Sequence, residues 1–171
     1  NPSACLPGAG RVLAVLAAGC HGGRIGEIGT GAGIGSAWMA SAMPADCTLV
    51  SVEIDERLAR AAAGLFEADS RVRVLTGDAR ELITPCGPFD LLFADGGWSD
   101  SAGFGSLVDL LRAGGRVVMD DVTPARQPPA DSPPRSGDAK RDFFFGDPRL
   151  ISAEVVLPDL RDALLVGTRI A

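Results

Sequence analysis

The feature that most constrains the fold is a glycine-rich segment, residues 27–33, which reads EIGTGAG. It begins at the end of a predicted short strand, Arg24–Ile28, and precedes a helical pattern, so it lies where a strand ends and a helix begins. Glycines at 29, 31 and 33 let the backbone turn tightly and approach a ligand, while the N–H groups of the next helix stay exposed. We therefore expect a ligand-binding loop here.

Short apolar or β-branched runs alternate with helical stretches along the chain. The predicted strands are Arg24–Ile28, Thr48–Ile54, Arg71–Thr76, Phe89–Ala94, Arg116–Met119, Leu150–Leu157 and Ala163–Ile170. The predicted helices are Arg11–Gly19, Gly33–Met43, Glu56–Ala68, Ala79–Ile83, Ser106–Arg112 and Ala139–Phe145. This alternation indicates an α/β fold, a doubly wound and mostly parallel sheet covered on both faces. The last two strands form a hairpin, which places one antiparallel strand in the sheet.

The length of 171 residues predicts a single domain, 1–171. Thr123–Gly137 contains five prolines and no apolar periodicity, so it is a long loop, either a lid over the site or a surface insertion. The chain does not begin with methionine, which suggests that N-terminal helices are missing upstream.

The charge and composition of the chain indicate which kinds of molecule it can bind. The net charge of −6 argues against binding to nucleic acid or an anionic membrane. No apolar run approaches the roughly 18 residues of a membrane helix. The cysteines Cys5, Cys20, Cys47 and Cys86 form no metal-binding pattern, and we interpret them as free thiols in a reducing cytoplasm. A small-molecule partner is expected, and a homodimer stays open.

Acidic residues follow the predicted strands. Glu53 ends the second strand, Asp78 follows the third, Asp95 the fourth, and the pair Asp120–Asp121 the fifth. Ligands of open α/β sheets bind beyond the carboxyl ends of the strands, so these side chains are expected to converge on one crevice. An acid in the place of Glu53 can accept hydrogen bonds from both hydroxyls of a ribose.

These motifs resemble a known family. Five segments are similar, in this order, to the motifs of class I S-adenosylmethionine-dependent methyltransferases. They are EIGTGAGIGSAWMA, VSVEID, TGDARELI, FDLLFAD and LLRAGGRVVMDDV. Within these the chain most resembles the small O-methyltransferases of the catechol and caffeoyl-CoA type, over roughly residues 6–171. The resemblance implies a Rossmann-like, seven-stranded, mostly parallel sheet with an antiparallel last strand.

The resemblance also implies a set of residues that bind S-adenosylmethionine at the strand ends. They are Glu27, Gly29, Gly31, Gly33, Ser36, Glu53, Ile54, Asp78, Ala79 and Asp95. By resemblance, Glu27 and the glycines hold the methionine portion and Ser36 binds its carboxylate. Glu53 takes the ribose hydroxyls, and Asp78 with the Ala79 amide reads the adenine.

In the metal-dependent members of the family, a divalent cation binds after strands four and five. The corresponding residues here are Asp95, Asp120 and Asp121, with Asp95 as the predicted catalytic residue. Three carboxylates suit Mg²⁺, which would hold two substrate oxygens and aim one of them at the methyl group. The resemblance thus implies O-methylation of a small hydroxylated acceptor, assisted by Mg²⁺.

One position departs from the family pattern. Trp98 stands where members commonly have a lysine that acts as a base, and Lys140, the only lysine, lies far along the chain. His21 precedes the first strand, at the opposite end of the sheet, and is interpreted as structural.

Three alternatives stay open at this point. One is a methyltransferase acting on RNA, and another is a non-catalytic relative that only binds the cofactor. The third is an NAD-dependent oxidoreductase. It is disfavoured because Ile34 replaces the third glycine of the dinucleotide fingerprint and the chain has no tyrosine.

Overall fold

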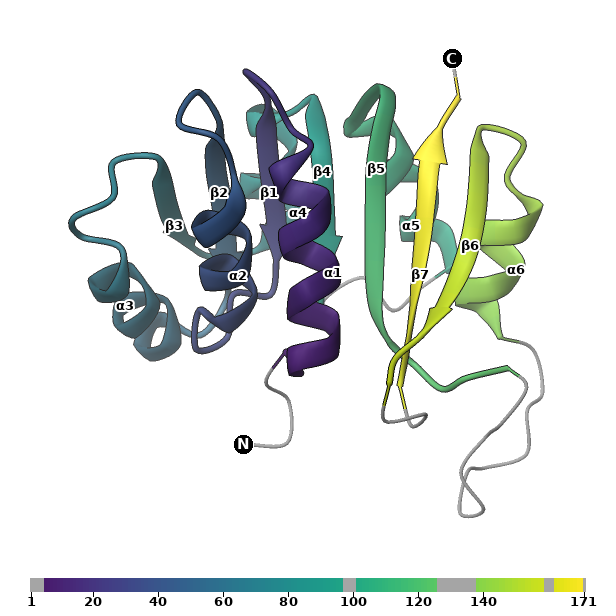
Figure 1. Cartoon of the computed structure of the whole chain (residues 1–171), viewed down its shortest axis with the longest axis horizontal. Coiled ribbons are helices and arrows are strands. Elements are labelled where there is room, and N and C mark those ends of the chain that lie inside the picture. Colours follow the sequence, from purple (N-terminus) through teal and green to yellow (C-terminus); the bar gives the residue numbers. More distant parts are fainter. Residues whose placement is uncertain (1–4, 97–100, 126–137, 159–161, 171) are drawn as a thin grey trace.

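The structure, a computed structural model, describes residues 5–96, 101–125, 138–158 and 162–170. These residues form a seven-stranded sheet with the strand order β3-β2-β1-β4-β5-β7-β6 (Figure 1). The strands are β1 (Arg24–Ile28), β2 (Thr48–Glu53), β3 (Val72–Thr76), β4 (Phe89–Ala94), β5 (Leu111–Val122), β6 (Leu150–Val156) and β7 (Ala163–Arg169). The helices are α1 (Pro7–Ala18), α2 (Ile34–Ala42), α3 (Glu56–Leu65), α4 (Ala79–Leu82), η1 (Thr84–Cys86), α5 (Ser101–Asp109) and α6 (Ala139–Gly146).

The sheet topology confirms the predicted fold class. β1 and β4 lie at the centre and pair in parallel, and every residue of β4 is buried. This burial on both faces explains why the run FDLLFA is apolar almost throughout rather than alternating. β7 runs antiparallel to both of its neighbours, β5 and β6, as the predicted hairpin requires.

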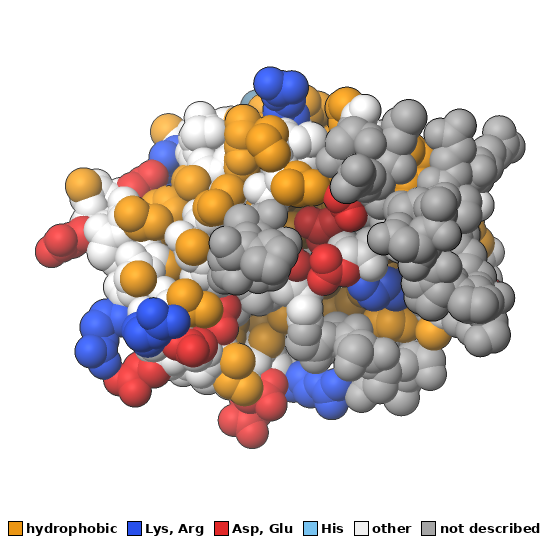
Figure 2. All heavy atoms as spheres, turned by 90° about the horizontal axis from the view of Figure 1, so that it is seen from below, with side chains coloured by type: hydrophobic (Ala, Val, Ile, Leu, Met, Phe, Trp, Pro, Cys, Tyr) orange, Lys and Arg blue, Asp and Glu red, His pale blue; other side chains and the backbone are white. Residues whose placement is uncertain are grey.

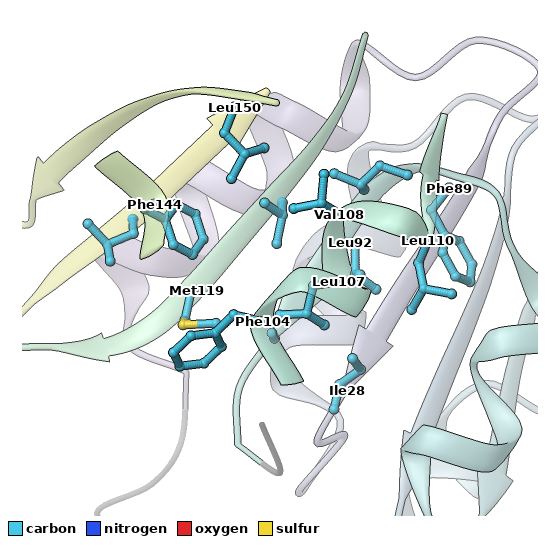
Figure 3. Close-up of a cluster of buried hydrophobic side chains, with 14 of the residues drawn as sticks. Ile28, Phe89, Leu92, Phe104, Leu107, Val108, Leu110, Met119, Phe144 and Leu150 are labelled. Carbon is cyan, nitrogen blue, oxygen red and sulfur yellow. The ribbon is translucent and has the colours of Figure 1, made fainter. Parts of the chain in front are cut away.

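Helices cover both faces of the sheet. In Figure 1, α1 and α2 lie on one face, and α5 and α6 lie on the other. The core under α5 and α6 includes the side chains labelled in Figure 3, among them Phe104, Phe144 and Met119. A second core, with Leu13 and Met39 at its centre, lies under α1 and α2. Burial against both cores fixes the central strands and therefore the positions of the loops at their ends.

The three consecutive phenylalanines of α6 point in different directions, as expected on a helix. Phe144 is buried in the core, Phe143 packs against Phe104 with ring centroids 5.4 Å apart, and Phe145 is 56% exposed. Phe144 therefore belongs to the core, Phe143 packs at its border, and Phe145 lies at the surface.

The prediction around residues 101–122 was wrong in its boundaries. α5 ends at Asp109 rather than Arg112, and β5 begins at Leu111 rather than Arg116. Leu111 pairs with Phe89 on β4, and the register shifts before Arg116 pairs with Leu91. This irregularity accommodates the glycine turn inside the strand, so pairing with β4 overrode the local helical pattern.

Several sequence predictions concern residues that lie outside the described part of the chain. Trp98 is one of them, and most of the proline-rich segment, residues 126–137, is another. Among the described helices, none combines the length and the apolar composition that crossing a membrane requires.

Candidate functional site

The glycine loop between β1 and α2 has the left-handed backbone that its sequence predicted. Gly29, Gly31 and Gly33 have φ values of 88°, 53° and 84°. A Cβ atom at Gly29 would lie 2.0 Å from the carbonyl oxygen of Asp95, so the loop lies directly against the end of β4. A Cβ atom at Gly31 would have no described atom within 4 Å, so open space adjoins the loop there.

Glu53, at the end of β2, is held in place by two backbone N–H groups. Its Oε2 accepts from Gly31 N at 2.7 Å, and its Oε1 accepts from Asp55 N at 2.9 Å. Asp55 in turn caps α3, so the loop, β2 and α3 are joined around one carboxylate. Glu53 is 8% exposed and retains lone pairs that can accept from a diol.

Glu27 and Ser36, two residues that the resemblance implies for the cofactor, are bonded to each other in the structure. Glu27 is fully buried, and its Oε2 accepts hydrogen bonds from the hydroxyls of Ser36 and Ser51. Burial raises the pKa of Glu27 to about 7, although the two hydroxyl hydrogen bonds oppose this effect. Because the Ser36 hydroxyl is buried and donates to Glu27, it supports the loop from within the protein.

The other residues implied for the cofactor lie at the neighbouring strand ends. Ile54 follows β2 and is 75% exposed. Asp78 follows β3 and caps α4, where its Oδ1 accepts from Arg80 N at 2.8 Å. Ala79 is the first residue of that helix and is partly buried. These positions border the same edge of the sheet as Glu53, because β2 and β3 are parallel neighbours.

The carboxylates of Asp95, Asp120 and Asp121 influence one another at the ends of β4 and β5. Burial and the charges of Asp120 and Asp121 raise the pKa of Asp95 to about 7. Burial is also the largest cause that raises the pKa of Asp120. Figure 2 looks onto this end of the sheet, and acidic side chains lie near the middle of that face beside a basic one.

The structure brings Lys140 to this cluster, although the sequence separation argued against it. Lys140 is the second residue of α6, and its Nζ donates to the carbonyl oxygens of Asp120 at 2.8 Å and Asp121 at 3.2 Å. Its charge also acts on Asp95. Lys140 therefore lies at the carboxylate cluster in space, although it is far from it along the chain.

The three aspartates do not form the predicted magnesium site in this structure. Within the described part of the chain, no three His, Cys, Asp or Glu side chains are placed to hold a metal ion. Asp120 Oδ1 accepts from Asp121 N at 2.8 Å, and the ammonium of Lys140 lies at the carbonyls of both residues. Magnesium binds through carboxylates and waters in a near-ideal octahedron, and this donor arrangement does not fit that requirement.

Two residues of the site were missed in the sequence. Ser51 is a buried polar residue in a strand that is otherwise mostly apolar, and its hydroxyl also lies 2.5 Å from Thr30 Oγ1. That polar residue, two positions before Glu53, was the available signal because alternate residues share a strand face. The only sequence signal for Lys140 was that it is the single lysine of a chain with fifteen arginines.

Comparison with known proteins assigns the family. The profile of a methyltransferase domain family matches residues 27–122, which run from Glu27 in β1 to the end of β5. The chain belongs to this methyltransferase family. The NAD-dependent oxidoreductase alternative is thereby set aside.

Two relatives support the assignment. This methyltransferase is 32% identical over 173 residues to a candidate O-methyltransferase of Mycobacteroides abscessus, across 95% of this chain and 80% of the relative. A second candidate O-methyltransferase, from Mycobacterium sp. strain JLS, is 36% identical over 123 residues. That alignment covers 68% of this chain and 56% of the relative, so the chain spans just over half of its length.

Solved structures share the fold of this methyltransferase. The O-methyltransferase TomG of Streptomyces achromogenes, involved in tomaymycin synthesis and solved with S-adenosylmethionine, has a TM-score of 0.74 at 26% identity. The match covers 99% of this chain and 82% of TomG. An O-methyltransferase of Bacillus cereus, solved with S-adenosylhomocysteine, has a TM-score of 0.77 at 22% identity over 99% and 84% of the two chains. The second likeness concerns the fold alone.

Proposed function

We propose that this protein transfers a methyl group from S-adenosylmethionine to a hydroxyl oxygen of a small molecule. Membership of the methyltransferase family and the likeness to O-methyltransferases support the reaction. The observation that carries the proposal is the Glu53 carboxylate, held by Gly31 and Asp55 beside the open space at Gly31. This is a preorganised acceptor for the ribose diol of the cofactor.

The described residues fit the parts of the cofactor. Glu53 would bind the ribose, and Asp78 and Ala79 would border the adenine together with the exposed Ile54. The glycine loop and the N-terminus of α2 offer backbone N–H groups to the methionine carboxylate. The surrounding carboxylates favour the positive sulfonium.

The reaction requires an oxygen nucleophile in line with the methyl group. S-adenosylmethionine supplies a methyl group on a sulfonium, whose carbon–sulfur bond breaks as the carbon–oxygen bond forms. We place the acceptor beside Asp95, which lies between the glycine loop and the Asp120–Asp121 turn. The hydroxyl proton leaves to the carboxylate cluster or to solvent. No step of this proposal passes through Mg²⁺, because the donor arrangement does not fit it.

Replacing Glu53 with alanine tests the cofactor site. We expect Glu53→Ala to weaken the binding of S-adenosylhomocysteine by about 1–3 kcal/mol, the usual effect of removing a charged hydrogen-bond partner. Glu53→Gln should also weaken binding, because an amide can accept from only one of the two backbone N–H groups. Isothermal titration calorimetry measures both losses, and NADH should not bind to the unaltered protein.

Glu67→Ala provides the matched control, because it removes one exposed carboxylate after α3 and causes the same change in net charge. Its affinity for S-adenosylhomocysteine should stay at the unaltered value. Tight binding of NADH together with no binding of S-adenosylhomocysteine would refute the proposed function.

A screen of hydroxylated small molecules with isotope-labelled S-adenosylmethionine would identify the acceptor. Transfer of label to a small hydroxylated compound supports the proposal, whereas transfer only to RNA would favour the RNA-directed alternative. Binding of the cofactor without transfer to any acceptor class would favour a non-catalytic relative.

The four free cysteines support action in a reducing cytoplasm.

A further inference from the structure

The first turn of α6 is bound to the chain segment that leaves β5. Asp138 caps the helix by accepting from Arg141 N. Lys140 then donates to the carbonyls of Asp120 and Asp121, and Arg141 donates to the carbonyl of Thr123 at 2.5 Å. Two adjacent cations of one helix therefore donate to three carbonyl groups within one four-residue segment, 120–123.

The backbone at Asp121 is shaped to present these carbonyls. Among the described non-glycine residues, Asp121 alone has a positive φ, 58°. A left-handed conformation carries an energetic cost for a residue other than glycine. The Asp121 N–H bonded to Asp120 Oδ1 and the ammonium bonded to both carbonyls compensate for this cost.

Lys140 is not the only group of α6 that attaches this segment. The side chain of Arg141 is mostly buried and forms ion pairs with Asp138 and Glu154. Glu154 Oε1 also accepts from Ala125 N at 2.7 Å. These contacts join α6 and β6 to the segment after β5 at Thr123 and Ala125, so that attachment remains when Lys140 is replaced.

The ammonium group of Lys140 has a hydrogen-bond donor available for a ligand. It carries three N–H donors, and within the described residues the bonds to Asp120 and Asp121 account for two of them. The positive charge also acts on the carboxylates of Asp95 and Asp120, at the place where the acceptor is proposed to bind. One donor therefore remains for an oxygen atom at this point of the site.

We propose that Lys140 takes the place of a divalent cation at the Asp95–Asp120–Asp121 cluster, so that its ammonium group orients the acceptor oxygen without a metal ion. This inference rests on the proposed function, because it assigns a positioning residue to the acceptor half of the same site. A hydroxyl or ionised oxygen of the acceptor accepts the third N–H bond and faces the methyl donor. Because Lys140 is covalently part of the chain, chelators do not remove this charge.

Binding of Mn²⁺ to the protein loaded with S-adenosylhomocysteine tests the inference without any acceptor. Free Mn²⁺ is followed by electron paramagnetic resonance, and the melting temperature is recorded with Mn²⁺ and with chelator. Lys140→Met removes the charge at similar length, and Lys140→Arg retains it. Arg60→Met is the matched control, because it removes a 78% exposed cation from α3.

The unaltered protein, Lys140→Arg and Arg60→Met should melt at the same temperature with Mn²⁺ as with chelator. Lys140→Met should bind Mn²⁺ at least about tenfold more tightly, since removing a positive charge from beside carboxylates favours a cation by a kcal/mol or more. Affinity for S-adenosylhomocysteine should stay within about twofold in all variants, because Lys140 contacts the acceptor side.

The inference is overturned if the unaltered protein binds Mn²⁺ as tightly as Lys140→Met does, or if chelator abolishes its methyl transfer. Should Lys140→Met fail to fold, the unaltered protein and Lys140→Arg still decide the question, because a higher melting temperature with Mn²⁺ than with chelator would overturn the inference. Failure of the proposed function is distinguishable, because it would appear as no binding of S-adenosylhomocysteine to the unaltered protein.

Discussion

Gly29→Ala is expected to destabilise the protein by about 3–5 kcal/mol and to abolish binding of S-adenosylhomocysteine. The new Cβ atom would lie 2.0 Å from the carbonyl oxygen of Asp95, at a φ of 88° that alanine rarely adopts. Neither the backbone at Gly29 nor the backbone at Asp95 can move away easily, because each is held by a hydrogen bond to a neighbouring strand. Asp95 N donates to the Ile28 carbonyl, and Gly29 N donates to the Val52 carbonyl. Urea denaturation followed by circular dichroism measures the loss.

Gly31→Ala is the matched control for this effect. Its φ of 53° also lies in the left-handed region, but the added Cβ atom has no described neighbour within 4 Å. It should therefore lose only about 1–2 kcal/mol of stability. Because the added methyl points into the proposed cofactor space, it should still reduce the affinity for S-adenosylhomocysteine. An equal loss of stability in both variants would show that the clash with Asp95 is not the cause.

Glu27→Gln is expected to flatten the dependence of stability on pH. Burial raises the pKa of Glu27 from 4.5 to about 7, so between these values the folded protein binds more protons than the unfolded chain. The free energy of unfolding therefore falls as the pH rises through this window, and it levels off above the folded pKa. At about 1.4 kcal/mol for each unit between the two pKa values, Glu27 accounts for a fall of ~3 kcal/mol.

Urea denaturation from about pH 4.5 to about pH 8 measures this difference. Asp95 and Asp120 also have raised pKa values, so the diagnostic quantity is the unaltered profile minus that of Glu27→Gln. Ser36→Ala is the complementary variant, because it removes a hydrogen bond that lowers the pKa of Glu27. Its stability should keep falling to a higher pH. A profile of Glu27→Gln as steep as the unaltered one would contradict the assignment.

Local sequence patterns were sufficient for the parallel half of the fold. The observed bounds of β1 and β4 equal the predicted ones. β4 is buried on both faces and reads as a mostly apolar run, and the glycine-rich segment marks the end of β1. The glycine loop was equally readable, since only glycine adopts all three left-handed φ values easily. The acidic residues at the strand ends share one edge because parallel strands end on the same side of a sheet.

Tertiary structure alone decided which partner each polar group of the site has. The Ser36 hydroxyl donates to Glu27, and β5 begins at Leu111 because Phe89 pairs with it. Lys140 reaches Asp120 only because β7 pairs with both β5 and β6, which places α6 beside the end of β5. Glycine turns and apolar runs depend on neighbouring residues and can be read locally. The charge of a site depends on which distant segments pack together, and no local pattern contains that information.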